Sequence, residues 1–483
     1  MEKNKVIQSI LFKFTERFAA KFIGFVIQTI LMRLLLPEVF GQVVLVQTVI
    51  NILVMVIENG VNTSLIQSQR VDERDYYTVF VITFAITGAA FLAVQAAAPL
   101  LGRLYRSAAI VKPLRVYALS LLFSAFNSIQ TARMQREMRF RELMFCNLAA
   151  SVLAGTFGIV LASSGAGIWA LVGYFSASVA FTCIITFLVQ RWVPHGGFSK
   201  ESARRLGGYG LRMMAASGVE QLYLGLRPLV IGKLFTPAEL GYYNQGQQLS
   251  HTVSINMDAA LRQVMFPVLS RAQEEREKFI DIMRRMSRLG SFVIFPVMFG
   301  LSAVARPLVL LVFKENWLPM APMLAILSIA EAQIPLTSAN TVALKSLGRS
   351  DLYARQELLR RVLMVAVLAV SILAFDSLRA IAVGYALSAW LDVAVTSLPL
   401  KKLLSYSVLD QARDVWKNGA GAALMWLAVR ALELLPLKAA LLLPVQILCG
   451  AAVYIALGLI LKNDSLLFIL DMLRKRRTAK ENL

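Results

Sequence analysis

Residues 33–47 read RLLLPEVFGQVVLVQ, and residues 233–248 read KLFTPAELGYYNQGQQ. In both stretches a basic residue stands four positions before a proline, a glycine four positions after the proline, and a glutamine six positions after the glycine. Proline restricts the residue before it to extended backbone, so each stretch predicts a helix that ends, turns and restarts. The common register at an offset of 200 residues predicts an internal repeat.

Apolar runs continue outward from both stretches. Hydrophobic residues make up 57% of the chain and charged residues 16%, with a mean hydropathy of +0.63. A soluble domain has about 45–50% apolar and about 25% charged residues, so the excess apolar surface must be buried in lipid. The net charge of +21 lies in short Lys and Arg clusters between apolar runs, without an aromatic base-stacking motif. This pattern indicates the loops of a membrane protein and no nucleic acid partner.

The chain is predicted to be an all-α polytopic membrane protein with about 14 transmembrane helices, since a bilayer core takes about 20 apolar residues per helix. The predicted spans lie near residues 9–35, 40–67, 76–98, 113–132, 143–163, 168–190, 209–232, 239–262, 289–312, 321–344, 357–375, 379–400, 416–435 and 439–461. Charges such as Lys13 interrupt the first apolar run, so we expect a retained helix rather than a cleaved signal peptide.

The positive charges and the repeat together predict the topology. With these spans, Lys and Arg are roughly three times as numerous in the segments on one side of the membrane as on the other. Cytoplasmic loops are enriched in Lys and Arg, and both termini lie on the side with more of them, so both are predicted to be cytoplasmic. The repeat offset equals six spans. The expected parts are therefore a six-helix lobe at 1–195, a second six-helix lobe at 196–405, and a helix pair with a basic tail at 406–483.

The two hairpin stretches, together with WLPMAPMLAILS at residues 317–328, resemble the Wzx-type polysaccharide flippases of the multidrug/oligosaccharidyl-lipid/polysaccharide (MOP) exporter superfamily. The resemblance extends over nearly the whole chain. It implies two six-helix lobes in a V-shaped arrangement, with the first and seventh helices lining a cleft, and a C-terminal helix pair. It also implies an undecaprenyl-diphosphate-linked oligosaccharide as substrate, carried across the bacterial inner membrane for exopolysaccharide, capsule or O-antigen biosynthesis.

A cationic stripe follows the first predicted span. Lys13, Arg17, Lys21 and Gln28 recur at spacings of four, four and seven residues, which puts them on one face of a helix. A charge at the centre of a span costs about 2.5–3.5 kcal/mol on insertion scales, so such a face favours water or protein. Ammonium and guanidinium groups suit an anionic diphosphate headgroup. Alternatively, Lys13 and Arg17 reach the cytoplasmic interface and bind no substrate.

The seventh and eighth predicted spans continue this pattern. Arg212, Glu220, Tyr223 and Arg227 share one face of the seventh span, and Arg227 is the strongest candidate for a diphosphate contact. A structural pair between Arg227 and Glu220 is the alternative. The eighth span offers Gln247, Asn256 and Arg262 as contacts for sugar hydroxyls, although amides also join helices to one another in membranes.

Four acids within predicted spans are candidates for coupling to a proton or a sodium ion. They are Glu58, Glu220, Glu331 and Asp392. Each could equally serve as the partner of a nearby arginine, and the sequence leaves both interpretations open.

The sequence offers no machinery for covalent chemistry. It lacks a phosphate-binding G-x-x-x-x-G-K-[ST] loop, and its two histidines, His195 and His251, form no cluster. Cys146, Cys183 and Cys449 lie far apart within apolar segments, as buried thiols do. We therefore expect a transporter without a metal or cofactor, in contact with membrane lipids. The alternatives are a lipid II flippase or a multidrug cation antiporter of the same superfamily and, less favoured, a membrane glycosyltransferase or polymerase.

Overall fold

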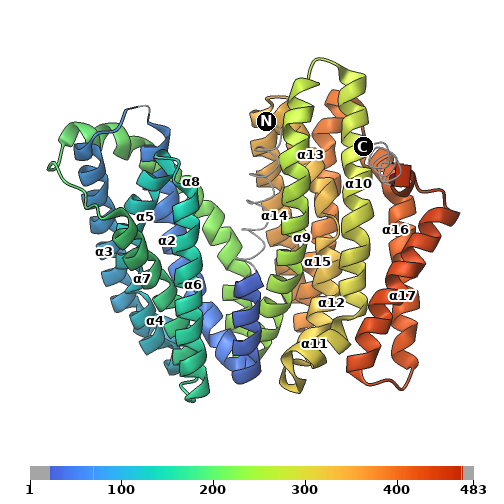
Figure 1. Cartoon of the computed structure of the whole chain (residues 1–483), viewed down its shortest axis with the longest axis horizontal. Coiled ribbons are helices and arrows are strands. Elements are labelled where there is room, and N and C mark those ends of the chain that lie inside the picture. Colours follow the sequence, from blue (N-terminus) through green and yellow to red (C-terminus); the bar gives the residue numbers. More distant parts are fainter. Residues whose placement is uncertain (1–21, 69, 469, 472–483) are drawn as a thin grey trace, which may run out of the picture. The chain divides into compact units, whose positions relative to one another are not determined.

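The structure is a computed structural model that describes residues 22–68, 70–468 and 470–471. Within these ranges the chain forms helices, short 3-10 turns and loops, without a strand. Its contacts divide it into two compact units, Met1–Gly241 and Tyr242–Leu483 (Figure 1). The expected all-α fold is confirmed.

The helices follow one another through short connections. The first unit contains a helix at Phe22–Leu34, α2 (Pro37–Gln67), α3 (Glu73–Leu104), α4 (Val111–Tyr117), α5 (Ser120–Arg136), α6 (Phe140–Ser163), α7 (Ile168–Gln190) and α8 (Lys200–Leu234). The remaining helices are α9 (Pro237–Arg271), α10 (Arg276–Ala303), α11 (Ala305–Phe313), α12 (Met320–Glu331), α13 (Ile334–Ser346), α14 (Ser350–Ala374), α15 (Leu378–Leu404), α16 (Val408–Ala431) and α17 (Ala439–Ile460).

Each predicted span overlaps a helix or a pair of consecutive helices. Three spans are broken where continuous helices were expected: between α4 and α5, at Val304 between α10 and α11, and at Ala332–Gln333 between α12 and α13. Among the described residues, 9 helical segments have both the length and the hydropathy of a membrane span. The number of 14 crossings stays a prediction.

The helix ends follow the repeated motif. One helix ends at Leu34 and the next begins at Pro37, and 200 residues later α8 ends at Leu234 and α9 begins at Pro237. The first turns of α2 and α9 touch, because a Cβ on Gly41 would lie 1.6 Å from the Pro237 carbonyl oxygen, and one on Gly241 would lie 2.3 Å from that of Pro37. Both contacts lie within the first unit. In each of them the glycine of one motif meets the proline carbonyl of the other motif. We call this reciprocal contact the glycine crossing.

Charged residues fix the start of α8 to the neighbouring helices of the first unit. The Asp75 carboxylate of α3 is only 2% exposed and accepts hydrogen bonds from Arg205 of α8 at 2.7 and 2.6 Å. In the segment before α8, the Trp192 indole donates to Glu73 of α3 at 3.1 Å, and its ring lies under the Arg133 guanidinium of α5 at 4.2 Å. The beginning of α8 is therefore anchored to α3 and α5.

Arg136, at the end of α5, caps the C-terminus of α2. Its Nη1 donates to the carbonyl oxygens of Leu65 and Ser68, each at 2.6 Å. The last carbonyls of a helix lack partners within it, and hydrogen bonds from a charged donor contribute about 1.5–3 kcal/mol. We expect Arg136→Met to lower the free energy of unfolding by about 2 kcal/mol, measured by thermal unfolding in detergent. Arg141→Met, at an exposed position on α6, is the control, and equal melting of both variants would contradict the cap.

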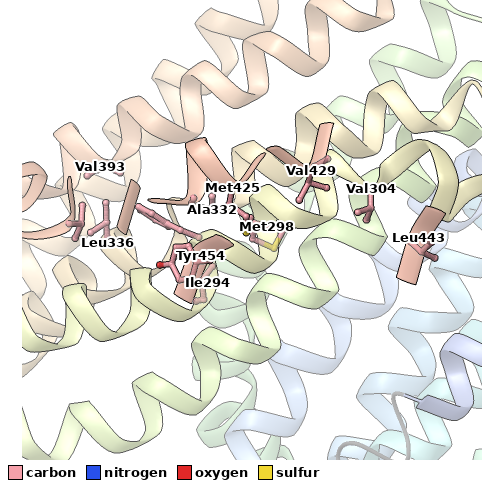
Figure 2. Packing of buried hydrophobic residues seen from close by; sticks show 14 residues of the cluster. Ile294, Met298, Val304, Ala332, Leu336, Val393, Met425, Val429, Leu443 and Tyr454 are labelled. Carbon is pink, nitrogen blue, oxygen red and sulfur yellow. The ribbon is translucent and has the colours of Figure 1, made fainter. Parts of the chain in front are cut away.

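An apolar core joins the helices of the second unit. It contains Ile294 and Met298 of α10, Leu336 of α13, Met425 of α16 and Tyr454 of α17 (Figure 2). The pair α16 and α17, red in Figure 1, thus packs on α10 as part of this unit.

Polar side chains add to this packing. Asn418 of α16 donates to the Ser291 hydroxyl of α10 at 2.7 Å, and Asn463, which follows α17, donates to Asn418 at 2.6 Å. The C-terminal helix pair is therefore held to α10 by hydrogen bonds as well as by apolar contacts.

Candidate functional site

One face of α9 is exposed and polar. Gln248, His251 and Asn256 are exposed, whereas Ser250 and Ser254 on the opposite face are fully buried. A helix face that meets lipid carries apolar side chains, because no water is available there to hydrogen-bond polar groups. The exposed face of α17 follows this rule and carries residues such as Leu441, Ile447 and Leu448. The face of α9 formed by Gln248, His251, Asn256 and Arg262, here called the polar face, is therefore suited to water or to a polar ligand.

Two residues predicted to contact substrate make local contacts on this face. The Arg262 guanidinium lies 2.9 Å from a carboxylate oxygen of Asp258, one turn earlier, whose side chain is only 1% exposed. Asn256 donates to the Thr252 carbonyl at 2.6 Å, which leaves its amide oxygen available. Gln247 lies beside the polar face and is half-buried. The ion pair between Asp258 and Arg262 was not predicted, although a spacing of four residues on a helix is a recognised signal for such a pair.

A buried carboxylate lies directly behind the polar face. Glu331, the last residue of α12, is 2% exposed, and its Oε2 accepts a hydrogen bond from Ser254 at 3.0 Å and lies 3.1 Å from His251 Nδ1. Its Oε1 accepts a hydrogen bond from the Tyr385 hydroxyl of α15 at 2.9 Å. The neighbouring Ala332 and Leu336 belong to the apolar core, which fixes the position of Glu331 (Figure 2).

The other acid predicted in the second unit makes an ion pair. Asp392 of α15 lies 3.1 Å from Arg360 of α14, which also contacts Glu357 at 2.7 Å. All three side chains are largely buried, so the pair joins α14 to α15. Arg360 and Glu357 are the partners that sequence reasoning did not identify.

In the first unit, the candidates on α8 differ in exposure. Arg227 is buried at 6% exposure, whereas Gly225, on the other side of the helix, packs on Thr48 and Ile52 of α2. Glu220 is exposed and Tyr223 half-buried. A charged group this well buried needs a polar partner, so Arg227 belongs to the packing between helices in this state.

The structure says less about the other predicted site residues of the first unit. Gln28, on the first helix, and Glu58, on α2, are both half-buried. Lys13, Arg17 and Lys21 lie outside the described residues, as does the side chain of Arg212.

A small apolar pocket of about 160 Å³ lies between α2, α3 and α8. Val79, Ile82 and Ile86 of α3 and Leu206 of α8 line it, and none of the predicted site residues does. The pocket suits a hydrocarbon chain rather than a charged headgroup. In the described part of the chain, no group of three or more His, Cys, Asp or Glu residues is arranged to hold a metal ion, and the three cysteines are free thiols.

The comparisons with known proteins agree with this architecture. The family model described as "Polysaccharide biosynthesis protein" matches residues 30–322. The succinoglycan biosynthesis transport protein ExoT of Rhizobium meliloti is 25% identical over 338 residues, which cover 70% of this chain and 68% of ExoT. The lipopolysaccharide biosynthesis protein WzxC of Escherichia coli is 23% identical over 314 residues, which cover 64% of this chain and 63% of WzxC.

A solved structure shares the fold over nearly the whole chain. The lipid II flippase MurJ, in an inward closed conformation, superposes with a TM-score of 0.76 at 12% identity, covering 94% of this chain and 99% of MurJ. The predicted resemblance to Wzx-type flippases of the MOP superfamily is thereby confirmed. The chain belongs to the family of polysaccharide biosynthesis proteins.

Proposed function

We propose that this protein moves an undecaprenyl-diphosphate-linked oligosaccharide across the bacterial inner membrane by alternating access, for the biosynthesis of a surface polysaccharide. The observation that carries the proposal is the polar face of α9, which exposes Gln248, His251 and Asn256 although the chain as a whole is 57% hydrophobic. The family membership and the relative named as a succinoglycan transport protein support the same substrate class.

The polar face suits the sugar part of such a substrate. Planar amides both donate and accept hydrogen bonds, as sugar hydroxyls do, so Gln247 and Asn256 match an oligosaccharide better than a hydrophobic drug. Arg262 supplies further donors and, because its charge is balanced by Asp258, it can bind sugars without requiring an anion. On the first unit, Gln28 and Tyr223 are the corresponding polar contacts.

The diphosphate requires positive charge. We assign it to Arg227, with Lys13, Arg17, Lys21 and Arg212 as further cationic contacts. Since Arg227 is only 6% exposed, it can reach the headgroup only in a conformation that uncovers it. Alternating access provides such a second conformation, and a ligand that binds it more tightly shifts the population toward it. Both termini are proposed to lie in the cytoplasm, where the basic tail meets anionic lipid.

The test is flipping of a fluorescent undecaprenyl-diphosphate oligosaccharide in proteoliposomes that contain the full chain. We expect Arg227→Ala and Lys21→Ala to slow flipping at least about tenfold, the equivalent of 1.4 kcal/mol, because each removes a charge that pairs with the diphosphate. Arg141→Ala, at an exposed site on α6, is the matched control.

Three outcomes separate the function from the site. Loss of flipping in both variants, with normal elution from a sizing column, supports substrate and site together. Flipping that survives both changes keeps the function and discards the cationic site. A folded protein that moves lipid II or a cationic drug but not this substrate would replace the proposed function with one of the alternatives.

A further inference from the structure

The pocket between α2, α3 and α8 is shaped for hydrocarbon. Among the described residues that line it, Ser64 of α2 has the one polar side chain. A buried water needs about two to four polar partners, so this space does not suit water. An apolar cavity of about 150 Å³ accommodates a six-carbon ring. At about 160 Å³, the pocket therefore accommodates about six carbon atoms of a lipid chain.

The pocket opens toward an apolar surface of the first unit. Leu211, which lines it, is 67% exposed, and Leu222, about three turns farther along the same side of α8, is 60% exposed. A helix face that meets lipid carries apolar side chains of this kind. A lipid chain can therefore enter the pocket from the hydrocarbon of the bilayer.

Two basic residues continue the pocket-lining side of α8 toward the start of the helix. Lys200, Arg204, Gly207 and Leu211 follow one another at spacings of four, three and four residues, which puts them on one stripe of α8. Lys200 and Arg204 are exposed. The Cα–Cβ bonds of a helix tilt toward its N-terminus, which directs both side chains away from the pocket. A negative group bound to them lies outside the pocket while its chain lies inside.

The distance between these cations and the pocket matches the dimensions of one lipid molecule. At about 1.5 Å per residue, the lining residues 206–214 of α8 lie about 9–21 Å beyond Lys200 along the helix. The lining residues 79–86 of α3 lie about 9–20 Å beyond its first residue, Glu73. One leaflet contributes about 15 Å of hydrocarbon. The pocket therefore lies at the depth of acyl chains whose phosphates reach Lys200 and Arg204.

An acid at this end of the pocket is already neutralised. Asp75 precedes Val79 by four residues on the side of α3 that lines the pocket, and it accepts hydrogen bonds from Arg205 at 2.7 and 2.6 Å. Lys200 and Arg204, by contrast, make no ion pair with an acid in the described part of the chain. The entrance to the pocket therefore carries positive charge that is available to an anionic headgroup.

We propose that the first unit holds an anionic phospholipid, with one acyl chain in the pocket and the phosphate at Lys200 and Arg204. Basic residues between helices on the cytoplasmic side, where this end of α8 is predicted to lie, are typical contacts of anionic headgroups. A phosphate bound there stays at the end of the helix, so the occupant is a resident lipid rather than the transported one. Its chain fills space between α3 and α8 and stabilises their packing. The proposal does not depend on the identity of the transported substrate.

The first test measures melting of the full-length protein in detergent as lipid is added. A ligand that binds only the folded protein raises the melting temperature with its concentration. Phosphatidylglycerol is expected to bind at least about tenfold more tightly than phosphatidylcholine with the same chains, because each of the two cations contributes about fivefold, the equivalent of about 1 kcal/mol. Glycerol phosphate, which has the charge without the chains, should cause no shift. Equal shifts with the two lipids, or an equal shift with glycerol phosphate, would overturn the proposal.

Two adjacent glycines provide a matched pair of variants for the pocket. A Cβ on Gly207 or on Gly208 would meet nothing within 4 Å, so both positions accept a larger side chain. Gly207→Phe fills the pocket and should abolish the shift caused by phosphatidylglycerol, measured against the variant's own lipid-free melting temperature. Gly208→Phe, one position round the helix and outside the pocket lining, should keep that shift. Equal lipid shifts in the two variants would show that no chain occupies the pocket.

Replacing the two cations tests the headgroup contact. Lys200→Gln and Arg204→Gln are each expected to lower the preference for phosphatidylglycerol over phosphatidylcholine about fivefold, without weakening the binding of phosphatidylcholine. Arg103→Gln, at an exposed position in the last turn of α3, is the matched control and should keep the preference. A preference that both variants retain would contradict the assigned phosphate contact.

Photocrosslinking locates the chain without any substitution. A phosphatidylglycerol with a diazirine on its acyl chain is expected to label residues 79–86 of α3 and 206–214 of α8 in the intact protein. Excess unlabelled phosphatidylglycerol should reduce this labelling more than the same concentration of undecaprenyl phosphate does. Labelling that spares both segments overturns the site. Labelling that undecaprenyl phosphate displaces more strongly overturns the phospholipid as occupant in favour of the transported lipid.

Discussion

Replacing Gly41 with alanine is expected to prevent the first unit from reaching its native packing. The added Cβ would lie 1.6 Å from the Pro237 carbonyl oxygen and 2.5 Å from its carbon. Both are backbone atoms, so no side-chain rotation can relieve the clash, and the first turns of α2 and α9 must separate. Overpacking costs about 1–3 kcal/mol even where side chains can adjust, and we expect a loss of about 3 kcal/mol or more here. Thermal unfolding and sizing-column elution in detergent measure it.

Two further glycines show whether the glycine crossing causes this loss. Gly241→Ala should behave like Gly41→Ala, since its Cβ would lie 2.3 Å from the Pro37 carbonyl oxygen. Gly88→Ala in α3 is the matched control, because its Cβ would meet nothing within 4 Å. Alanine is favoured over glycine in a helix interior by about 1 kcal/mol, so this control should be neutral or stabilising. If Gly41→Ala melts with the Gly88→Ala control, the contact described here is wrong.

Asp414→Ala is expected to produce the largest loss of stability in the second unit. The Asp414 side chain of α16 is 8% exposed, accepts a hydrogen bond from Arg288 Nε of α10 at 3.1 Å, and lies 3.6 Å from Arg284. Removing one partner of a buried ion pair costs about 3–5 kcal/mol, because the other charge stays buried without compensation. We expect a value near the lower end, since the Arg288 side chain is 34% exposed. Thermal unfolding in detergent gives the measurement.

A tyrosine adds to this effect. The Tyr406 hydroxyl, between α15 and α16, donates to Asp414 at 2.8 Å. Burial, followed by the negative charge of Asp414, raises the pKa of the Tyr406 phenol above its usual range, so the phenol stays protonated and donates at any physiological pH. Asp414→Ala therefore also leaves a fully buried hydroxyl without its acceptor.

The matched control for Asp414→Ala is the same substitution in an exposed pair. Asp351 lies 2.9 Å from Arg349, and the two side chains are 53% and 42% exposed. Exposed pairs contribute about 0.2–1 kcal/mol, so Asp351→Ala should change the melting temperature little. Similar melting of the two variants would show that the Asp414 cluster does not hold α16 to α10.

The fold could be predicted because its signals are local. Long apolar runs located the helices, and the Pro and Gly positions located the turns at Leu34–Pro37 and Leu234–Pro237. The break at Val304 was missed, although Pro307 follows it closely and disfavours a continuous helix. The break after α12 likewise precedes Pro335. Hydropathy averaged over a span hides such interruptions, since the residues on both sides are equally apolar.

The candidate site could be predicted only in part, because its contacts join distant residues. Glu331 was identified as an acid within a span, but its neighbour His251 is 80 residues away, and no periodicity connects the two. Asp392 was identified without Arg360 for the same reason. Arg227 was expected to be accessible from its helical face, yet it is buried at 6% exposure, because burial of a helix face depends on which distant segments pack against it.

The glycine crossing also constrains how this chain can diverge from its relatives. Each hairpin supplies the glycine that makes room for the carbonyl of the other hairpin, so a larger residue in either one damages both. Neither hairpin can therefore change at these positions without a matching change in the other. A chimera that takes one hairpin from a distant homologue and keeps the other is at risk at this contact, and exchanging the two hairpins together preserves it.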